Sequence, residues 1–319
     1  MSLRVAVQMD PIENVGIAGD STFALMLKAQ DLGHTLFHYL ASDLSFEEGR
    51  VRAVARQVSV QRVLGDHFEA GEPVTIDLVD DVDVVLMRQD PPFDIAYITA
   101  TYLLERISDR TLVVNDPRSV RDCPEKLFVL DFAEFMPPTL ITRSAEDVRR
   151  FHQQHGEIVI KPLHGNAGAA VFRIDVDGQN LTALIELFGT SWPEPFIAQA
   201  FLPAVADGDK RIVLVDGEVA GAINRRPGKG EIRSNLAAGG TAEAVELSER
   251  DRAICDALGP ELKRRGLLFV GIDVIGGNLT EINVTSPTGI VAIDKFNGSD
   301  TPGRIWSAID RRLAERTKA

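Results

Sequence analysis

Three side chains with oxygen donors lie close together in the stretch GIDVIGGNLTEINVTSPTG, residues 271–289: Asp273, Glu281 and Asn283. The stretch is rich in β-branched residues and predicts a hairpin that turns within residues 276–278. Glu281 and Asn283 share a face, because strand side chains alternate. Asp273 lies opposite Glu281 if the turn has three residues, and on the other face if it has two. Three oxygen ligands on one face suit Mg²⁺, whereas a solvent-facing hairpin is the simpler alternative.

Two lysines and a glycine-containing loop could approach the phosphates of a nucleotide. The loop KPLHGNAGAAV, residues 161–171, begins with Lys161 and contains Gly165 and Gly168. It matches neither the GxxxxGK[ST] phosphate loop nor the GxGxxG dinucleotide motif. It therefore predicts either a plain turn or a flap whose backbone N–H groups reach a phosphate chain. Lys126, in DCPEKLF, is either a second phosphate-binding cation or a surface lysine.

Further charged residues gather in two segments of the C-terminal part. DGDKRIVLVDGE places Asp209 and Arg211 at the start of a predicted strand, as surface charges or as groups that face a polyanion and a sugar hydroxyl. NRRPGKGEIRSNLAAGG, residues 224–240, combines four cations with four glycines and lacks apolar periodicity; the cations are Arg225, Arg226, Lys229 and Arg233. This loop is either a disordered linker or a lid that brings cations to developing phosphate charge and expels water.

Arg88 follows an apolar strand, residues 82–87, and precedes Asp90 and two prolines. Ligands bind at the carboxyl ends of strands in open α/β sheets. Arg88 is therefore expected either to hold a substrate carboxylate through its guanidinium fork or to form an ion pair with Asp90.

Composition narrows the class of protein. The chain has 319 residues, 45% hydrophobic and 25% charged, which is typical of a globular protein of two or three modules. Its net charge of −13 argues against a nucleic-acid partner. No apolar run reaches the roughly 18 residues of a membrane span and no signal peptide is recognisable, so we expect a cytoplasmic protein without a membrane partner. Cys123 and Cys255 lack metal-binding spacing, in keeping with a reducing compartment.

The predicted elements divide the chain into three parts. Residues 1–122 alternate strand and helix, which indicates a doubly wound α/β domain with a parallel sheet, interrupted by a hairpin within GRVRAVARQVSVQ. Its helices are predicted at 21–32 and 94–107. Residues 123–201 hold short strands and helices, and residues 202–319 hold two hairpins and two helices. The helices of these two parts are predicted near 125–132, 144–154, 181–188, 248–265 and 303–316.

The order of the motifs is more specific than any one of them. MDPI, LMRQDPPFD, RDCPEKLF, DGDKRI, SNLAAGG and LTEINVTSPTG follow one another, together with DSTFALMLKAQ, ATYLLER and GLLFVGIDVIG. This set resembles the ATP-grasp superfamily, and within it the bacterial glutathione synthetases, over essentially the whole chain. The resemblance implies a Rossmann-like, substrate-binding domain (1–122) and a two-part ATP-grasp fold with mixed and antiparallel sheets. The two parts are a small lid subdomain (123–201) and a metal- and substrate-binding subdomain (202–319) with a mobile loop at 226–240.

The resemblance also implies roles for single residues. Those implied to bind ATP are Lys126, Lys161, Gly165, Gly168, Gln199, Ala200, Leu202 and Asp209. Those implied to act in catalysis are Arg211, Arg226 and Arg233, and those implied to contact the peptide substrate are Arg88, Asn283 and Ser286. The implied metal ligands are Asp273, Glu281 and Asn283. The flap departs from the family pattern at His164, Asn166 and Ala167, where an acidic residue and a tighter glycine run are common.

The activity that the resemblance implies is the ADP-forming ligation of γ-glutamylcysteine to glycine through an acyl phosphate. ATP is the co-substrate, and Mg²⁺ or Mn²⁺ is the metal. A homotetramer is implied as well. Two other interpretations stay open: an ATP-grasp ligase for another peptide or amino acid, and an ATP-binding module without catalysis.

Overall fold

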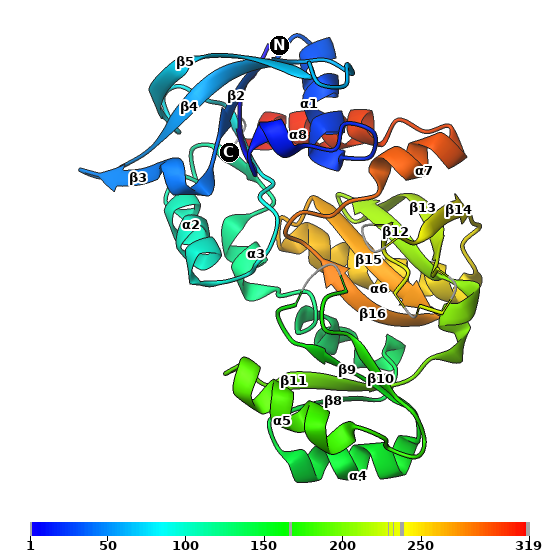
Figure 1. The fold of residues 1–319 in the computed structure, drawn as a ribbon. Coiled ribbons are helices and arrows are strands. Elements are labelled where there is room, and N and C mark those ends of the chain that lie inside the picture. Colours follow the sequence, from blue (N-terminus) through cyan, green and yellow to red (C-terminus); the bar gives the residue numbers. More distant parts are fainter. Residues whose placement is uncertain (1, 166–167, 229, 232, 237–238, 317–319) are drawn as a thin grey trace.

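The chain folds around three β-sheets, one from each successive part of the sequence (Figure 1). The structure, a computed structural model, describes residues 2–165, 168–228, 230–231, 233–236 and 239–316. Within these ranges, no helix combines the length and the apolar character that crossing a membrane requires.

The first sheet has seven strands and is parallel at its centre. Its strands are β1 (Arg4–Gln8), β2 (Thr35–Tyr39), β3 (Leu44–Glu47), β4 (Arg50–Val60), β5 (Phe68–Asp77), β6 (Val84–Met87) and β7 (Leu112–Val114). The strands β2, β1, β6 and β7 run parallel, as the alternation of strand and helix predicts. The predicted hairpin within residues 49–61 is wrong, because these residues form one continuous strand, β4, whose apolar side chains alternate without a turn. The hairpin turn lies before it, at Glu48 and Gly49.

Helices cover both faces of this sheet. One face carries α1 (Ser21–Asp31) and α8 (Thr301–Arg316), and the other carries α2 (Ile95–Glu105) and α3 (Pro117–Asp122). The helices α1 and α2 begin where the sequence predicts, because Asp20 and Asp94 accept hydrogen bonds from backbone N–H groups of the first turn. The helix α8 comes from the far end of the chain, and its Trp306 indole donates to the carbonyl of Leu25.

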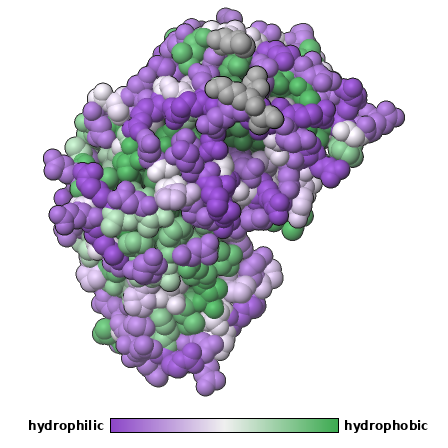
Figure 2. Space-filling model, turned by 180° about the vertical axis from the view of Figure 1, so that it is seen from behind, coloured by the Kyte–Doolittle hydropathy of each residue, from purple (hydrophilic) through white to green (hydrophobic). Residues whose placement is uncertain are grey.

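The second sheet forms a separate lobe with its own apolar core, which includes Ile160 and Phe188. Its four antiparallel strands are β8 (Thr139–Thr142), β9 (Ile158–Pro162), β10 (Phe172–Ile174) and β11 (Phe196–Ala200), and its helices are α4 (Ala145–His155) and α5 (Leu181–Ser191). An indentation sets this lobe off from the rest of the surface (Figure 2). The helix predicted near 125–132 is instead a 3₁₀ segment, η3 (Phe128–Phe135), interrupted by a non-helical backbone at Phe132.

The third sheet is antiparallel and carries helices on both faces. Its strands are β12 (Asp209–Val215), β13 (Glu218–Arg226), β14 (Thr241–Ala244), β15 (Phe269–Ile275) and β16 (Asn278–Asn283), and its helices are α6 (Glu249–Arg264) and α7 (Ile290–Asn297). Short 3₁₀ segments elsewhere are η1 (Ile12–Asn14), η2 (Ala41–Asp43) and η4 (Pro203–Asp207). The sequence did not indicate β14 or α7, which are only four and eight residues long.

The first and third sheets share their apolar cores, whereas the small lobe does not. Val85 of β6 and Ile272 of β15 belong to one buried cluster, and Val7 of β1 and Ile290 of α7 belong to another. The two sheets are therefore fixed against each other by side-chain packing over both of their faces. The loops between them can hold ligand-binding groups in a defined position.

Asn115, directly after β7, joins the first sheet to the third. Its side chain is buried and donates hydrogen bonds to the carbonyls of Phe269, at 2.7 Å, and Val284, at 2.8 Å. Its Oδ1 accepts a hydrogen bond from the N–H of Phe269 at 2.8 Å. One amide thus satisfies backbone groups at the start of β15 and just after the end of β16, the two strands that carry Asp273, Glu281 and Asn283.

We expect Asn115→Ala to lower the free energy of unfolding by about 3–5 kcal/mol, because three buried backbone groups lose a partner at once. Urea denaturation followed by circular dichroism measures the change. The exposed Asn14→Ala is the matched control and should shift stability by less than about 0.5 kcal/mol. Equal stability of the two variants would contradict this role of Asn115.

Candidate active site

A cavity of 360 Å³ lies where the loops of the three sheets meet, and most of the predicted site residues line it. A cavity of this volume is sufficient for a small-molecule ligand. The predicted residues on its wall are Lys161, Gly168, Gln199, Ala200, Leu202, Asp209, Arg211, Arg233, Asp273, Glu281, Asn283 and Ser286. The predicted residues that are not on its wall are Arg88, Lys126, Gly165 and Arg226.

The hairpin of β15 and β16 brings Asp273 and Glu281 opposite each other. Its turn has two residues, Gly276 and Gly277, both with positive φ. On its own, a two-residue turn would place the two carboxylates on opposite faces, as the sequence analysis states. A β-bulge at Thr280 restores the pairing, because the extra residue shifts the register by one. The Thr280 hydroxyl donates to the carbonyl of Asp273 at 3.1 Å, which fixes the bulge.

Asp273 is held between two arginines. Arg211, its cross-strand neighbour on β12, donates from Nε to Oδ1 at 2.7 Å and from Nη2 to Oδ2 at 3.1 Å. Arg225 on β13 approaches Oδ1 to 2.9 Å. Burial alone would raise the pKa of Asp273, but these two guanidinium groups hold it far below its usual range. Asp273 is therefore a carboxylate at any physiological pH.

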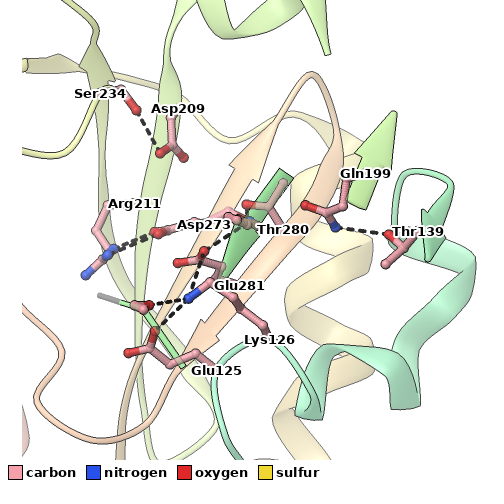
Figure 3. A network of polar contacts seen from close by, with 12 residues as sticks. Glu125, Lys126, Thr139, Gln199, Asp209, Arg211, Ser234, Asp273, Thr280 and Glu281 are labelled. Carbon is pink, nitrogen blue, oxygen red and sulfur yellow. Dashed lines mark hydrogen bonds and ion pairs between the residues drawn. The ribbon is translucent and has the colours of Figure 1, made fainter. Parts of the chain in front are cut away.

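Glu281 is held between two lysines from different parts of the chain, and Figure 3 shows one of them, Lys126, beside it. Its Oε1 lies 3.2 Å from Nζ of Lys161 on β9 and 3.5 Å from Nζ of Lys126. Burial would raise the pKa of Glu281, but the two ammonium groups lower it. Burial would lower the pKa of Lys126, but Glu281 and Glu125 raise it. The lysines that were predicted to bind phosphate thus pair with a predicted metal ligand.

Asp209 is buried with a guanidinium and a hydroxyl. Its Oδ2 accepts hydrogen bonds from Arg225 Nη2 at 2.5 Å and from Ser234 Oγ at 2.9 Å, and its buried Oδ1 has no partner among the described residues. Burial raises the pKa of Asp209 to about 6, although Arg225 opposes this. Arg225 consequently bridges Asp209 and Asp273, two carboxylates on neighbouring strands.

The cavity receives Arg225 rather than the predicted Arg226. The turn between β12 and β13 also has two residues, and a bulge between Val213 and Leu214 of the pairing again shifts the register by one. Asp209 therefore pairs with Arg225, and Arg226 extends from the sheet, where it forms an ion pair with Glu243 of β14 at 2.8 Å. The side chain of Arg226 is half exposed. The bulge therefore decides whether Arg225 or Arg226 faces the cavity, and no sequence pattern indicates the bulge.

The flap and the lid loop meet at the edge of the cavity. Lys126 Nζ donates to the carbonyl of Gly165 at 2.6 Å, which ties the flap to the lysine. Gly168 has a φ of +73°, and a side chain there would come within 3.1 Å of Arg233 Cδ. Arg233 also pairs with Glu231 of its own loop at 3.1 Å. The flap residues Asn166 and Ala167 lie outside the described residues.

Arg88 is buried and, within the described residues, does not form the ion pair with Asp90 that was one of its two predicted roles. Its guanidinium donates to Thr22 Oγ1 at 3.0 Å and to the carbonyl of Pro287 at 2.9 Å, and no ion pair joins it to Asp90 in the part of the chain that the structure describes. Its cation lies 5.0 Å from the centroid of the Phe269 ring. Ser286 Oγ donates to the carbonyl of Arg88 at 3.2 Å. Arg88 therefore fixes the loop that follows β16.

Sequence reasoning also missed Glu125, Ser234 and Thr139. Glu125 precedes Lys126 in the motif DCPEKLF and lines the cavity. Ser234 follows Arg233 in the lid loop and reaches Asp209. Thr139 Oγ1 accepts a hydrogen bond from Gln199 Nε2 at 3.0 Å, which orients the predicted adenine-binding strand β11. The sequence places the acidic Glu125 directly before Lys126, but a surface ion pair has the same pattern.

We expect Asp209 to lower the free energy of unfolding by roughly 2–3 kcal/mol as the pH rises from about 4 to about 7. The pKa of Asp209 in the folded protein, about 6, lies above the value in an unfolded chain. The folded state therefore binds this proton more tightly, and the stabilisation is complete below the unfolded pKa and lost as the pH rises through 6. Urea denaturation at successive pH values should show a smaller decrease for Asp209→Asn, and equal pH profiles would contradict the assignment.

Comparisons with known proteins cover nearly the whole chain. Residues 3–121 match the family described as prokaryotic glutathione synthetase, N-terminal domain, and residues 125–298 match prokaryotic glutathione synthetase, ATP-grasp domain. The glutathione synthetase of Rhodopseudomonas palustris is 55% identical over 98% of this chain and 100% of its own length. The glutathione synthetase of Pseudomonas syringae pv. tomato is 46% identical over 99% of both chains.

Solved structures show the same fold at lower identity. The D-cycloserine synthetase DcsG superimposes with a TM-score of 0.69 at 17% identity and covers 97% of this chain and 99% of its own. The ATP-grasp ligase PsnB, complexed with a variant of a minimal precursor, Mg and ADP, superimposes with a TM-score of 0.61 at 21% identity and covers 99% of both chains. The predicted fold class and family resemblance are confirmed: the chain belongs to the prokaryotic glutathione synthetase family of ATP-grasp ligases.

Proposed function

We propose that this protein ligates γ-glutamylcysteine to glycine at the cavity described above, with the conversion of ATP to ADP and phosphate. The observation that carries the proposal is the row of paired charges on the cavity wall, in which three buried cations, Lys161, Arg211 and Arg225, stand beside carboxylates. Entering phosphate groups can take over the lysines from Glu281, because an anion of higher charge competes for the same cations. The family assignment and the charge pattern of the cavity both support ATP-dependent ligation.

We assign the nucleotide to the side of the cavity formed by the small lobe. Lys126 and Lys161 face the phosphates there, and the flap that carries Gly165 and Gly168 covers them. The adenine ring fits beside β11, near Gln199, Ala200 and Leu202, all of which line the cavity. Asp209 lies on β12, the next strand along the chain and part of the third sheet, and its Oδ1, which has no partner among the described residues, is available to a ribose hydroxyl.

The donors of Asp273, Glu281 and Asn283 suit a divalent cation, Mg²⁺ or Mn²⁺. Carboxylate and amide oxygens are hard ligands, and the buried Asn283 Nδ2 has no partner among the described residues, so the amide is free to orient toward a ligand. No group of three His, Cys, Asp or Glu side chains converges within the described ranges, so the site relies on this amide. When bound there, the metal would neutralise phosphate charge and orient the phosphate chain.

The ligation needs charge stabilisation and positioning rather than a protein nucleophile. The cysteinyl carboxylate of γ-glutamylcysteine attacks the γ-phosphate, and an acyl phosphate and ADP form. The glycine amine then attacks the acyl carbon, and phosphate leaves. Arg211, Arg225 and Arg233 line the cavity and stabilise the negative charge that develops in both steps. The lid loop, 226–240, excludes water that would hydrolyse the acyl phosphate.

The peptide substrate is assigned to the side of the cavity formed by the loop after β16. Ser286 lines the cavity there, and Asn283 lies at the start of this loop. Arg88 supports the loop from beneath through the carbonyl of Pro287. We therefore assign Arg88 a positioning role in substrate binding.

Glycine-dependent release of ADP tests the reaction. The purified protein, Mg-ATP and γ-glutamylcysteine should release ADP rapidly only when glycine is present, and glutathione should accumulate in equal amount. Release that requires a different acid or amine would favour a ligase for another peptide. Nucleotide binding without release, over a panel of acids and amines, would favour a non-catalytic module.

The homotetramer and the cytoplasmic location implied by the family resemblance remain predictions. Sedimentation equilibrium of the purified protein tests the first, and fractionation of the source cells tests the second. Neither affects the assignment of the cavity.

We expect Arg225→Ala to lower kcat/KM by roughly 10²–10³, because the cavity loses one preorganised cation. Arg226→Ala is the matched control on the adjacent residue and should change kcat/KM by less than about threefold, since its side chain pairs outside the cavity. Steady-state kinetics at varied ATP and saturating γ-glutamylcysteine and glycine measure kcat/KM for ATP of the two variants. A larger loss for Arg226→Ala would contradict the register of β13.

We expect Glu281→Gln to remain folded while turnover falls by roughly 10² or more, because a metal ligand and the counter-charge of two lysines are lost. Binding of Mn²⁺ in the presence of ATP, measured by electron paramagnetic resonance, should weaken by about 10- to 100-fold. Glu243→Gln, which removes the partner of Arg226, is the control and should bind Mn²⁺ normally. Normal Mn²⁺ binding and turnover of Glu281→Gln would contradict the metal assignment.

A further inference from the structure

A second, much smaller cavity adjoins the main one and shares Glu125 and Thr285 with it. Its volume is 20 Å³, which gives room for one group of the size of water or ammonium. The side chains around it come from four segments of the chain and are Pro91, Phe93, Pro124, Glu125, Leu163, His164 and Thr285. Glu125 is its sole charged group within the part of the chain that the structure describes.

Apart from Glu125, the walls of the small cavity are uncharged. The rings of Phe93 and His164 are stacked with their centroids 6.0 Å apart, and Phe93 also packs at 5.3 Å against Tyr97 of α2. Burial lowers the pKa of His164, so that its ring is neutral at pH 7. His164 is one of the flap residues that departs from the family pattern. The cavity therefore combines one carboxylate with two stacked rings.

Among the described residues, Asp209 and Glu125 each have only a share of one cation, and of the two it is Glu125 that lines the small cavity. Asp273 is neutralised by two arginines and Glu281 by two lysines, whereas Lys126, at 3.5 Å from Oε2, is the one cation within ion-pair distance of Glu125 among the described residues. Lys126 is in turn shared with Glu281. A buried carboxylate that has only a share of one cation offers a favourable place for an ammonium group.

Glu125 also lies next to the place where the acyl phosphate would form. The backbone carbonyl of Glu125 accepts a hydrogen bond from the N–H of Ile282 at 3.1 Å, so it is anchored between Glu281 and Asn283. Lys126 bridges Glu125 and Glu281, because its Nζ lies 3.5 Å from a carboxylate oxygen of each. An ammonium group bound to Glu125 is thus held beside the phosphate-binding lysine, and after it transfers one proton to the Glu125 carboxylate the neutral amine can attack an acyl carbon bonded to phosphate, which leaves.

We propose that Glu125 binds the ammonium group of the glycine substrate at the small cavity, and that Phe93 and His164 make the site selective for glycine. The inference rests on the proposed function and names the amine site of that reaction. When the ammonium fills a space of this size, the α-carbon lies beside the Phe93 and His164 rings that line it. A β-carbon would meet the rings there, so alanine and larger amino acids are excluded.

Replacement of Glu125 by glutamine, its neutral isostere, tests whether the carboxylate binds the ammonium group of glycine. Glu125→Gln should raise KM for glycine roughly 10- to 100-fold, because a charge-assisted hydrogen bond is lost, while KM for ATP and for γ-glutamylcysteine changes less than about threefold. Hydroxylamine, whose amino group is neutral at pH 7, should form the hydroxamate at similar rates with Glu125→Gln and with the unmodified protein. Glu134→Gln, an exposed glutamate on η3, is the matched control and should leave every constant unchanged.

Removal of either ring tests whether Phe93 and His164 make the site selective for glycine. Phe93→Ala should raise kcat/KM for alanine relative to glycine by about tenfold or more, because space for a methyl group is created beside the α-carbon. His164→Gly should change the ratio in the same direction, so a folding defect in one variant does not remove the test. Unchanged preference for glycine in both folded variants would overturn the proposed selectivity.

The outcomes separate this inference from the proposed function. An unmodified protein that forms no glutathione would refute the proposed function itself. An active protein whose Glu125→Gln variant has a normal KM for glycine would overturn the amine site alone. Equal increases of KM for ATP and glycine would also overturn it, and would show that Glu125 acts by holding Lys126.

Discussion

A row of paired charges across the third sheet is the constraint on which the rest of the site depends. Arg211, Asp273 and Glu281 are direct neighbours on β12, β15 and β16, and Arg225 lies diagonally from Asp273 on β13. A buried charge is costly unless it is paired, so each member of the row requires the others at their registered positions. Loss of one partner leaves the opposite charge buried and uncompensated. The register of three strand pairs is therefore as much a part of the site as the side chains.

Residue types and spacing were sufficient to predict most members of this site. Asp273, Glu281 and Asn283 were identified because carboxylates on an apolar hairpin are unusual, and Lys161 because it ends a strand beside a glycine-containing loop. What the sequence could not show was the register. Two-residue turns in both hairpins would point the wrong side chains inward, and a single bulge in each corrects this. A bulge depends on tertiary packing rather than on any local pattern.

The same reasoning explains the elements that were missed. Long amphipathic helices such as α6 begin at a capping residue and carry apolar residues at helical spacing. In the first part of the chain, predicted strands and helices alternate clearly along the sequence. β14 and α7 are short, and each is stabilised by contacts with distant parts of the chain. Gly221 illustrates the dependence, because a side chain at this position of β13 would come within 2.4 Å of Ile293 in α7. Such an approach between strand and helix is fixed by tertiary structure, and local propensity does not signal it.

The position of α8 has a consequence for the order in which the molecule can assemble during its synthesis. This helix covers α1 and buries Trp306 against a carbonyl 281 residues earlier in the chain. The N-terminal sheet emerges from the ribosome first, yet the face that carries α1 stays partly uncovered until residues 301–316 follow. At a usual rate of about 5–20 residues per second, that delay lasts on the order of ten seconds or more. Apolar side chains of α1 and the first sheet are therefore exposed for most of the synthesis of the chain.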